Sequence, residues 1–139
     1  MIAFLVLFII NIWIFFKTQE PPKLIEVKEK YRILRENIND EKFSMLKREI
    51  PVTGFYSMRG TVGNNTNKGG DISVCLDGDT NHIFHVLLHE LAHCTVKEYE
   101  HTEQFWNNFT ELRNKSVELG IYEMINDKTA FCGDHIQDK

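Results

Sequence analysis

The stretch HVLLHELAHCTVKEYEHTEQFW, residues 85–106, decides how this chain folds and which chemistry it can support. It contains the pattern H-E-x-x-H, formed by His89, Glu90 and His93. Residues four apart lie on one face of a helix, so both imidazoles can reach a single tetrahedral Zn²⁺. Glu90 lies about 100° around the helix, where it can act as general base on a zinc-activated water without being a ligand. The pattern therefore predicts metal-assisted hydrolysis.

A third zinc ligand is expected after the helix, because a catalytic zinc usually has three protein ligands and one open position. His101 follows His93 by eight residues, and the intervening VKEYE can turn the chain back toward the metal. Glutamates beside it are alternative ligands: Glu98, Glu100 and Glu103. The predicted zinc ligands are therefore His89, His93 and His101.

Two further histidines share the same helical face but are not expected to bind the metal. His82 and His85 continue the stripe of His89 and His93 with spacings of three and four. Val86 stands where a base would have to follow His85. An additional ligand would also close the open position of a catalytic zinc. We interpret both residues as packing or rim residues.

The surrounding sequence predicts mixed helices and short strands. Apolar residues at helical spacing indicate an amphipathic helix from residue 23 onward, followed by a shorter helix near residues 43–46. Residues 53–70, rich in Gly, Asn and Thr, are typical of short strands or hairpins. A strand is predicted over 72–76 and helices over 81–97 and 102–119, the last capped by Thr102 and ended by Gly120. The tail after it is expected to be irregular.

The N-terminal run MIAFLVLFIINIWIFF predicts a transmembrane anchor over residues 1–17. As a helix it spans roughly 24 Å, against a hydrocarbon core of about 30 Å, and Lys17 can snorkel to the interface. A cleaved signal peptide would need a charged n-region and an A-x-A-like site, and a buried helix would show a polar face. Lysines follow the span, which by the positive-inside rule places the C-terminal domain on the cytosolic side of the membrane.

Length and composition favour one domain behind this anchor. The 139 residues carry a net charge of -4, and no basic patch gives direct evidence for nucleic-acid binding. Three cysteines, Cys75, Cys94 and Cys132, are too few and too irregular for a disulfide framework. A reducing compartment is the simpler interpretation, with one bridge plus a free thiol as the alternative. We divide the chain into the anchor, a linker with an amphipathic helix over 18–50, and a zinc metallopeptidase domain over 51–139.

The segment HELAHCTVKEYEHTEQFW resembles the active-site segment of the WLM and SprT-like zinc metallopeptidases, which are gluzincin-like. In these families a short loop and a third His follow H-E-x-x-H, and an aromatic residue comes about four positions later, as His101 and Phe105 do here. The similarity covers about residues 70–133 and is strongest to small WLM-like proteins of large DNA viruses and protists. It implies a compact α+β zincin in which His89, His93 and His101 bind Zn²⁺ and Glu90 is the base.

The resemblance also implies a small antiparallel sheet packed on the active-site helix. The edge strand of that sheet, near Ile72–Leu76, would pair with an extended protein or peptide substrate. WLM and SprT proteins linked to DNA–protein crosslink repair carry ubiquitin-like, SUMO-binding or DNA-binding appendages that this sequence lacks. The resemblance therefore bears on the chemistry rather than on the repair role.

The sequence leaves open which residue stabilises the oxyanion of the reaction. The candidates are Tyr99, Tyr122, Arg59 and His135, and no pattern aims any of them at the metal. Cys94 and Cys132 are expected to pack rather than to bind metal.

The predicted function is a membrane-anchored, zinc-dependent metallopeptidase that hydrolyses peptide bonds. One alternative is a non-catalytic, zinc-stabilised binding module, which would have no need of Glu90. The other is a membrane-tethered structural protein, such as a virion component, whose histidines only pack.

Overall fold

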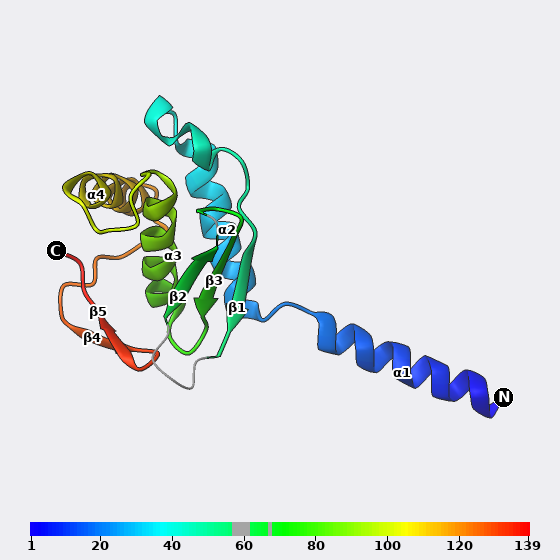
Figure 1. Cartoon of the computed structure of the whole chain (residues 1–139). Coiled ribbons are helices and arrows are strands. Elements are labelled where there is room, and N and C mark those ends of the chain that lie inside the picture. The colour runs from blue at the N-terminus through cyan, green and yellow to red at the C-terminus, as the bar shows by residue number, and fades with distance from the viewer. Residues whose placement is uncertain (57–61, 67) are drawn as a thin grey trace.

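The computed structural model describes residues 1–56, 62–66 and 68–139, which form helices around one three-stranded sheet and a small hairpin (Figure 1). The helices are α1 (Ile2–Thr18), α2 (Pro22–Asn37), the 3₁₀ helix η1 (Glu41–Leu46), α3 (Thr80–Cys94) and α4 (Glu103–Glu118). The strands are β1 (Val52–Phe55), β2 (Gly63–Thr66), β3 (Asp71–Cys75), β4 (Thr129–Phe131) and β5 (Asp134–Ile136). This arrangement confirms the predicted α+β class.

Helix α3 lies at the centre of the molecule. Strands β2 and β3 pack on one side of it and α4 on another, while α2 packs on both α3 and β1 (Figure 1). Nine of its fifteen residues are buried, which is why the helix is apolar on more than one face. The H-E-x-x-H pattern therefore sits on the most enclosed element of the fold.

The sheet differs from the expected one in two respects. Its strand order is β1-β3-β2, and β1 runs parallel to β3 while β2 runs antiparallel to it, so the sheet is mixed rather than antiparallel. The expectation that residues 72–76 form the edge strand is also wrong, because β3 is the central strand. Ile72 and Val74 are fully buried against the core, and β1 satisfies the second edge of their strand. The edge strand beside α3 is β2.

Helix α2 has the amphipathic character that its sequence predicts. Pro22 occupies its first turn, where the missing N–H costs nothing. The apolar residues at helical spacing are all buried: Leu24, Val27, Tyr31, Leu34 and Ile38. The predicted shorter helix is the 3₁₀ helix η1, which buries Phe43 and Leu46 and leaves Met45 exposed. These side chains belong to the same core as those of α3.

The ends of α3 and α4 position the loop between them. Helix α3 ends at Cys94, earlier than predicted, because the N–H of Thr95 donates back to the carbonyl of Ala92 and the chain turns away. The side chain of Thr102 accepts a hydrogen bond from the N–H of Phe105 at 3.2 Å, which confirms the predicted cap. Gly120, with φ of +73°, follows the end of α4 as predicted.

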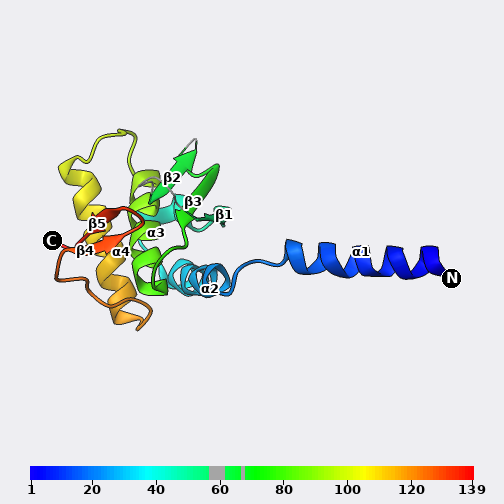
Figure 2. The same ribbon diagram turned by 90° about the horizontal axis from the view of Figure 1, so that it is seen from below.

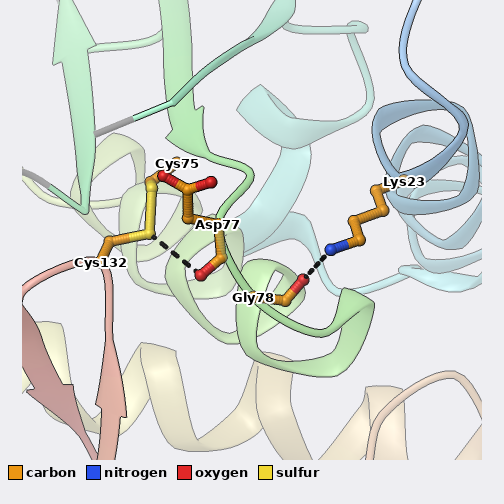
Figure 3. The surroundings of a disulfide bond; sticks show 5 residues. All are labelled: Lys23, Cys75, Asp77, Gly78 and Cys132. Atoms are coloured by element: carbon orange, nitrogen blue, oxygen red, sulfur yellow. Dashed lines mark hydrogen bonds between the residues drawn. A yellow bond between two sulfur atoms is a disulfide. The ribbon is translucent and has the colours of Figure 1, made fainter. Parts of the chain in front are cut away.

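The C-terminal tail is more ordered than the sequence suggests. Strands β4 and β5 form an antiparallel hairpin, and a disulfide joins Cys132 in its turn to Cys75 at the end of β3 (Figure 3). The simpler interpretation of three unpaired cysteines is therefore wrong, and the alternative of one bridge with Cys94 free is correct. No local spacing could reveal this pair, because 57 positions separate the two residues.

The turn after β3 also contacts the start of α2. The ammonium of Lys23 donates a 2.7 Å hydrogen bond to the carbonyl of Gly78, three residues beyond Cys75 (Figure 3). Sγ of Cys132 lies 3.8 Å from the carbonyl oxygen of Asp77. The end of β3, the hairpin and α2 thus meet at one point of the molecule.

Helix α1 has no buried residue and extends away from the other elements in both views (Figures 1 and 2). Among the described residues, no single helix is long and apolar enough to count as a membrane span. The length and hydropathy of a membrane span are reached only by α1 and α2 taken together, and these two helices are bent by 50° relative to each other. The predicted transmembrane helix is therefore not confirmed.

Candidate metal centre and catalytic cleft

Three imidazoles converge at the end of α3. The Nε2 atoms of His89 and His93 are 3.2 Å apart, and Nε2 of His101 lies 3.1 Å from each of them. Three ligands at about 2.0–2.1 Å from a tetrahedral metal would lie roughly 3.3–3.4 Å from one another. The observed triangle is close to that size, and imidazole nitrogens suit zinc. The three residues predicted as ligands thus form a donor set that fits Zn²⁺.

The third histidine is brought to the other two by the loop between α3 and α4. Lys68, in the turn between β2 and β3, donates hydrogen bonds to the carbonyls of Val96 and Glu98 at 2.6 and 2.5 Å. The cap at Thr102 fixes the chain immediately after His101. The loop is therefore held at both ends of its path.

An aromatic floor supports the three histidines. The ring of Phe105, which is fully buried, lies with its centroid 5.0, 4.5 and 4.8 Å from those of His89, His93 and His101. Trp106 packs on Phe105 and on two of the imidazoles. Burial, followed by the neighbouring imidazoles, lowers the pKa of His89 to about 3 and that of His93 to about 4. Both rings are therefore neutral at pH 7, which leaves a lone pair for a metal.

Glu90 lies beside this triangle in a water-poor environment. Its side chain is buried, and burial raises the pKa of its carboxyl to about 7. The carboxylate approaches β2 so closely that a Cβ on Gly63 would lie 3.2 Å from its Oε1. A carboxyl that titrates near neutral pH is suited to accept and return a proton.

Glu90 lines two cavities. The first has a volume of 320 Å³ and contains His89, His101 and His135 in its lining. The second has a volume of 210 Å³ and is lined by Asn64, Lys68, His93 and Tyr99 among others. Residues of β2 or next to it border both cavities. The two cavities, together called the cleft, are thus bordered by β2 or its neighbour Val62 and by proposed metal ligands, whereas larger hollows of 400 and 380 Å³ lie elsewhere.

The comparisons with known proteins bear on this arrangement. A family model described as the WLM domain matches residues 32–138, which includes the H-E-x-x-H helix, His101 and the C-terminal hairpin. This chain belongs to the WLM family. WLM proteins are zinc-protease-like, which agrees with a donor set that suits zinc.

One curated relative from a giant virus also aligns with most of this WLM chain. It is the uncharacterized protein R325 of Acanthamoeba polyphaga mimivirus, 34% identical over 131 residues. The alignment covers 80% of the present chain and 64% of the viral protein, so the chain spans slightly less than two thirds of its relative. No solved structure matches this sequence.

The other two histidines of the WLM helix stand apart from the metal triangle, as the sequence predicts. Nδ1 of His85 lies 2.9 Å from the hydroxyl of Tyr122 and 3.3 Å from Oδ1 of Asp138, in a buried network. The ring of His82 packs edge-on against Phe131 of the hairpin at 6.1 Å. Both residues connect α3 to the C-terminal segment.

The structure separates the four candidates for oxyanion stabilisation. Tyr122 is buried in the network with His85, and Tyr99 lines the smaller cavity with most of its surface exposed. His135 lines the larger cavity together with two of the proposed metal ligands. Arg59 lies outside the described residues.

Sequence reasoning missed several residues that shape the site. Lys68 fixes the loop that carries His101, and Asn65 donates a 3.0 Å hydrogen bond to the carbonyl of Glu90. Oδ1 of Asn65 also accepts from the N–H of Gly69, which orients its amide. Both residues make these contacts because β2 and the turn after it lie against the end of α3. The local sequence gives no sign of that long-range packing.

Proposed function

We propose that this protein is a zinc-dependent metallopeptidase that hydrolyses peptide bonds. The observation that carries the proposal is the convergence of three imidazoles beside a buried carboxyl with a pKa near 7. His89, His93 and His101 would hold the metal. When bound, Zn²⁺ would supply the Lewis acidity that makes water a nucleophile near neutral pH and polarises a carbonyl group.

Glu90 would move the proton in this reaction. Its carboxylate accepts a proton from the attacking water, and the protonated carboxyl then donates it to the leaving amine. The pKa near 7 suits both halves of this cycle, because the group is readily protonated and deprotonated at neutral pH. Phe105 and the core behind it exclude water from one side of the site, so each charge there acts in a low dielectric.

An extended peptide is the substrate that the cleft fits. Strand β2 pairs with β3 on one side and has no strand partner on its other edge among the described residues, and β2 or its neighbour Val62 lines both cavities that share Glu90. Addition of a substrate strand to that edge would align a peptide backbone across the histidines, with side-chain selectivity set by the cavities. The proposed substrate-binding edge is thus β2, in place of the strand expected from the sequence.

The test compares the full chain, purified in detergent, with Glu90→Gln and with Glu123→Gln as a control on an exposed glutamate. Bound zinc is measured beside the cleavage of a labelled unfolded protein. We expect one zinc per chain in all three proteins and cleavage only in the parent and in Glu123→Gln. Zinc in all with cleavage in none would favour the non-catalytic binding module. Proteins without zinc would favour a structural role.

We further propose that α1 attaches the enzyme to a membrane. Its large apolar side chains are exposed along its whole length, and Lys17 lies over the ring of Trp13 in its last turn. The lysines that follow favour a cytosolic domain, whereas the disulfide favours an oxidising compartment. Flotation with vesicles, with and without residues 1–17, tests the attachment, and protease protection in cells identifies the side. If the full chain and the chain without residues 1–17 float with the vesicles to the same extent, the proposed attachment through α1 is contradicted.

A further inference from the structure

We propose that His135 is a substrate-contacting residue of this enzyme, which donates a hydrogen bond to the scissile carbonyl oxygen as negative charge develops there. The inference rests on the proposed function. It assigns a role in the cleft to a residue 34 positions beyond the last metal ligand, carried on the C-terminal hairpin.

The first support is the position of His135. Its exposed side chain and those of His89, Glu90 and His101 line the same 320 Å³ cavity. The cavity thus has two of the proposed metal ligands and the proposed base in its lining, together with an imidazole from the hairpin. A peptide bound in it would present its carbonyl to the metal ligands and to this imidazole.

The second support is that, apart from the indole of Trp106, the other polar side chains of this cavity are engaged or already have an assigned role. His85 is hydrogen-bonded to Tyr122, and the amide of Gln137 donates to the carbonyl of Asn126 at 2.7 Å. Asp134 is an acceptor, and it already receives the backbone N–H of His135. Among the described residues, the imidazole of His135 makes no hydrogen bond. It is therefore available to a ligand.

The third support is that the hairpin holds His135 in a defined place. His135 pairs with Ala130 across the hairpin, and the adjacent Ile136 is buried in the core. The disulfide of Cys132 fixes the turn of the hairpin to β3 (Figure 3). A donor that is held before the reaction needs no reorganisation when charge appears, which is the condition for effective electrostatic stabilisation.

The chemistry of the reaction calls for a group of this kind. Attack on a peptide carbonyl places negative charge on its oxygen, and loss of one donor to that oxygen typically costs about 10²–10³ in kcat. Imidazole donates through an N–H in its neutral form and in its protonated form. His135 would keep its proton throughout, because proton transfer is assigned to Glu90.

The experiment uses the zinc-loaded full chain in detergent, with His135→Ala, His135→Gln and His82→Ala. The glutamine variant retains an N–H donor, and the His82 variant removes a histidine that touches the same hairpin outside the cavity. We expect kcat to fall about 10²-fold in His135→Ala with KM and zinc content unchanged. The glutamine variant should recover part of the loss, and His82→Ala should retain the parent rate.

A second measurement does not depend on turnover. A phosphinic peptide with alanine side chains imitates the charged oxygen, and calorimetry on the zinc-loaded proteins should give about 10²-fold weaker binding to His135→Ala. If the parent and His135→Ala bind the phosphinic peptide with equal affinity, or if neither binds it measurably, the proposal is overturned. Loss of cleavage in Glu90→Gln together with an unchanged kcat in His135→Ala would reject the role of His135 alone. Cleavage by Glu90→Gln would reject the proposed function instead.

Discussion

Cys75 at the end of the central strand is bonded to Cys132, which lies three residues before His135 on the C-terminal hairpin. The bond closes a loop that contains β4, both long helices of the site and the His101 loop. It therefore constrains the unfolded chain between β3 and the C-terminal hairpin and fixes the hairpin against the sheet.

Removal of this bond should reduce both stability and activity. The double variant Cys75→Ser, Cys132→Ser is expected to lose about 2–4 kcal/mol of unfolding free energy, by the usual effect of a cross-link on the unfolded chain. Its kcat should also fall, because the hairpin that carries His135 loses its tether. Urea unfolding with and without reductant measures the first effect. Cys94→Ser, at the free thiol, is the control and should remain sensitive to reductant; no effect of reductant on the parent would contradict the prediction.

Glu90→Gln should stabilise the metal-free protein at high pH while it abolishes activity. The folded-state pKa of Glu90 is raised from 4.5 to about 7. The folded protein therefore binds more protons than the unfolded chain between these values, and stability falls as pH rises through them. At 1.36 kcal/mol per pKa unit the loss is at most about 3 kcal/mol, and the glutamine variant avoids it.

Urea unfolding of the chelated proteins at pH 5 and pH 8 measures this difference. The same six histidines are present in parent and variant, so the two proteins differ only at position 90. Glu123→Gln, at an exposed position, should behave as the parent does at both values of pH. If the difference in unfolding free energy between the parent and Glu90→Gln is the same at pH 5 and pH 8, the pKa of Glu90 is not raised in the folded protein.

Asp138 should contribute stability that acid removes. Burial by itself raises the pKa of this carboxyl, but the nearby imidazole of His85 and hydrogen bonds from Tyr122 and from the N–H of Ile125 outweigh burial and hold it below its ordinary value. A lowered pKa gives stability that is present above the unfolded value of about 4 and lost as pH falls through the folded value.

Asp138→Asn is therefore expected to lower the unfolding free energy by about 1–3 kcal/mol at pH 7, because a buried charged acceptor is replaced. The difference from the parent should shrink as the pH falls below about 4. Asp127→Asn, at an exposed position of the same segment, is the matched control. Thermal unfolding from pH 3 to pH 7 provides the measurement. If the stability difference between the parent and Asp138→Asn grew toward low pH, the pKa of Asp138 would be raised rather than lowered by folding.

The helix cap at Thr102 should couple stability to metal binding. Thr102→Ala removes the acceptor of the Phe105 N–H and is expected to cost about 0.5–2 kcal/mol. Zinc affinity should fall as well, because His101 precedes the cap directly. Thr102→Ser keeps a hydroxyl at the cap and should restore both properties. Competition with a zinc-binding dye measures the affinity, and an unchanged zinc affinity in Thr102→Ala would show that His101 is placed independently of the cap.

The sequence was informative wherever the determining contacts are local. The spacing of His89 and His93, the cap at Thr102 and the glycine after α4 each depend on one or two helical turns, and the structure places all of them as predicted. The periodicity of α2 likewise predicted its buried face. Such features follow from helix geometry alone.

The incorrect predictions concern contacts between distant segments. The place of β3 in the sheet depends on its pairing with both β1 and β2, and the disulfide depends on where the hairpin packs. The contact of Lys68 with the His101 loop likewise requires the β2–β3 turn to lie against the end of α3. Strand order and long-range pairing leave no periodic trace in a single sequence, so they were accessible only in the folded chain.

The backbone of β2 lies close to α3 at Gly63. A Cβ at this position would lie 2.6 Å from Cγ1 of Val86 and 3.2 Å from the carboxylate of Glu90. The distance between the proposed substrate-binding strand and Glu90 is thus set by the absence of a side chain. Any larger residue would widen the cleft and move a bound peptide away from the carboxylate. The hydrogen atom that stands in place of a side chain at Gly63 therefore determines how close the proposed substrate strand can come to Glu90.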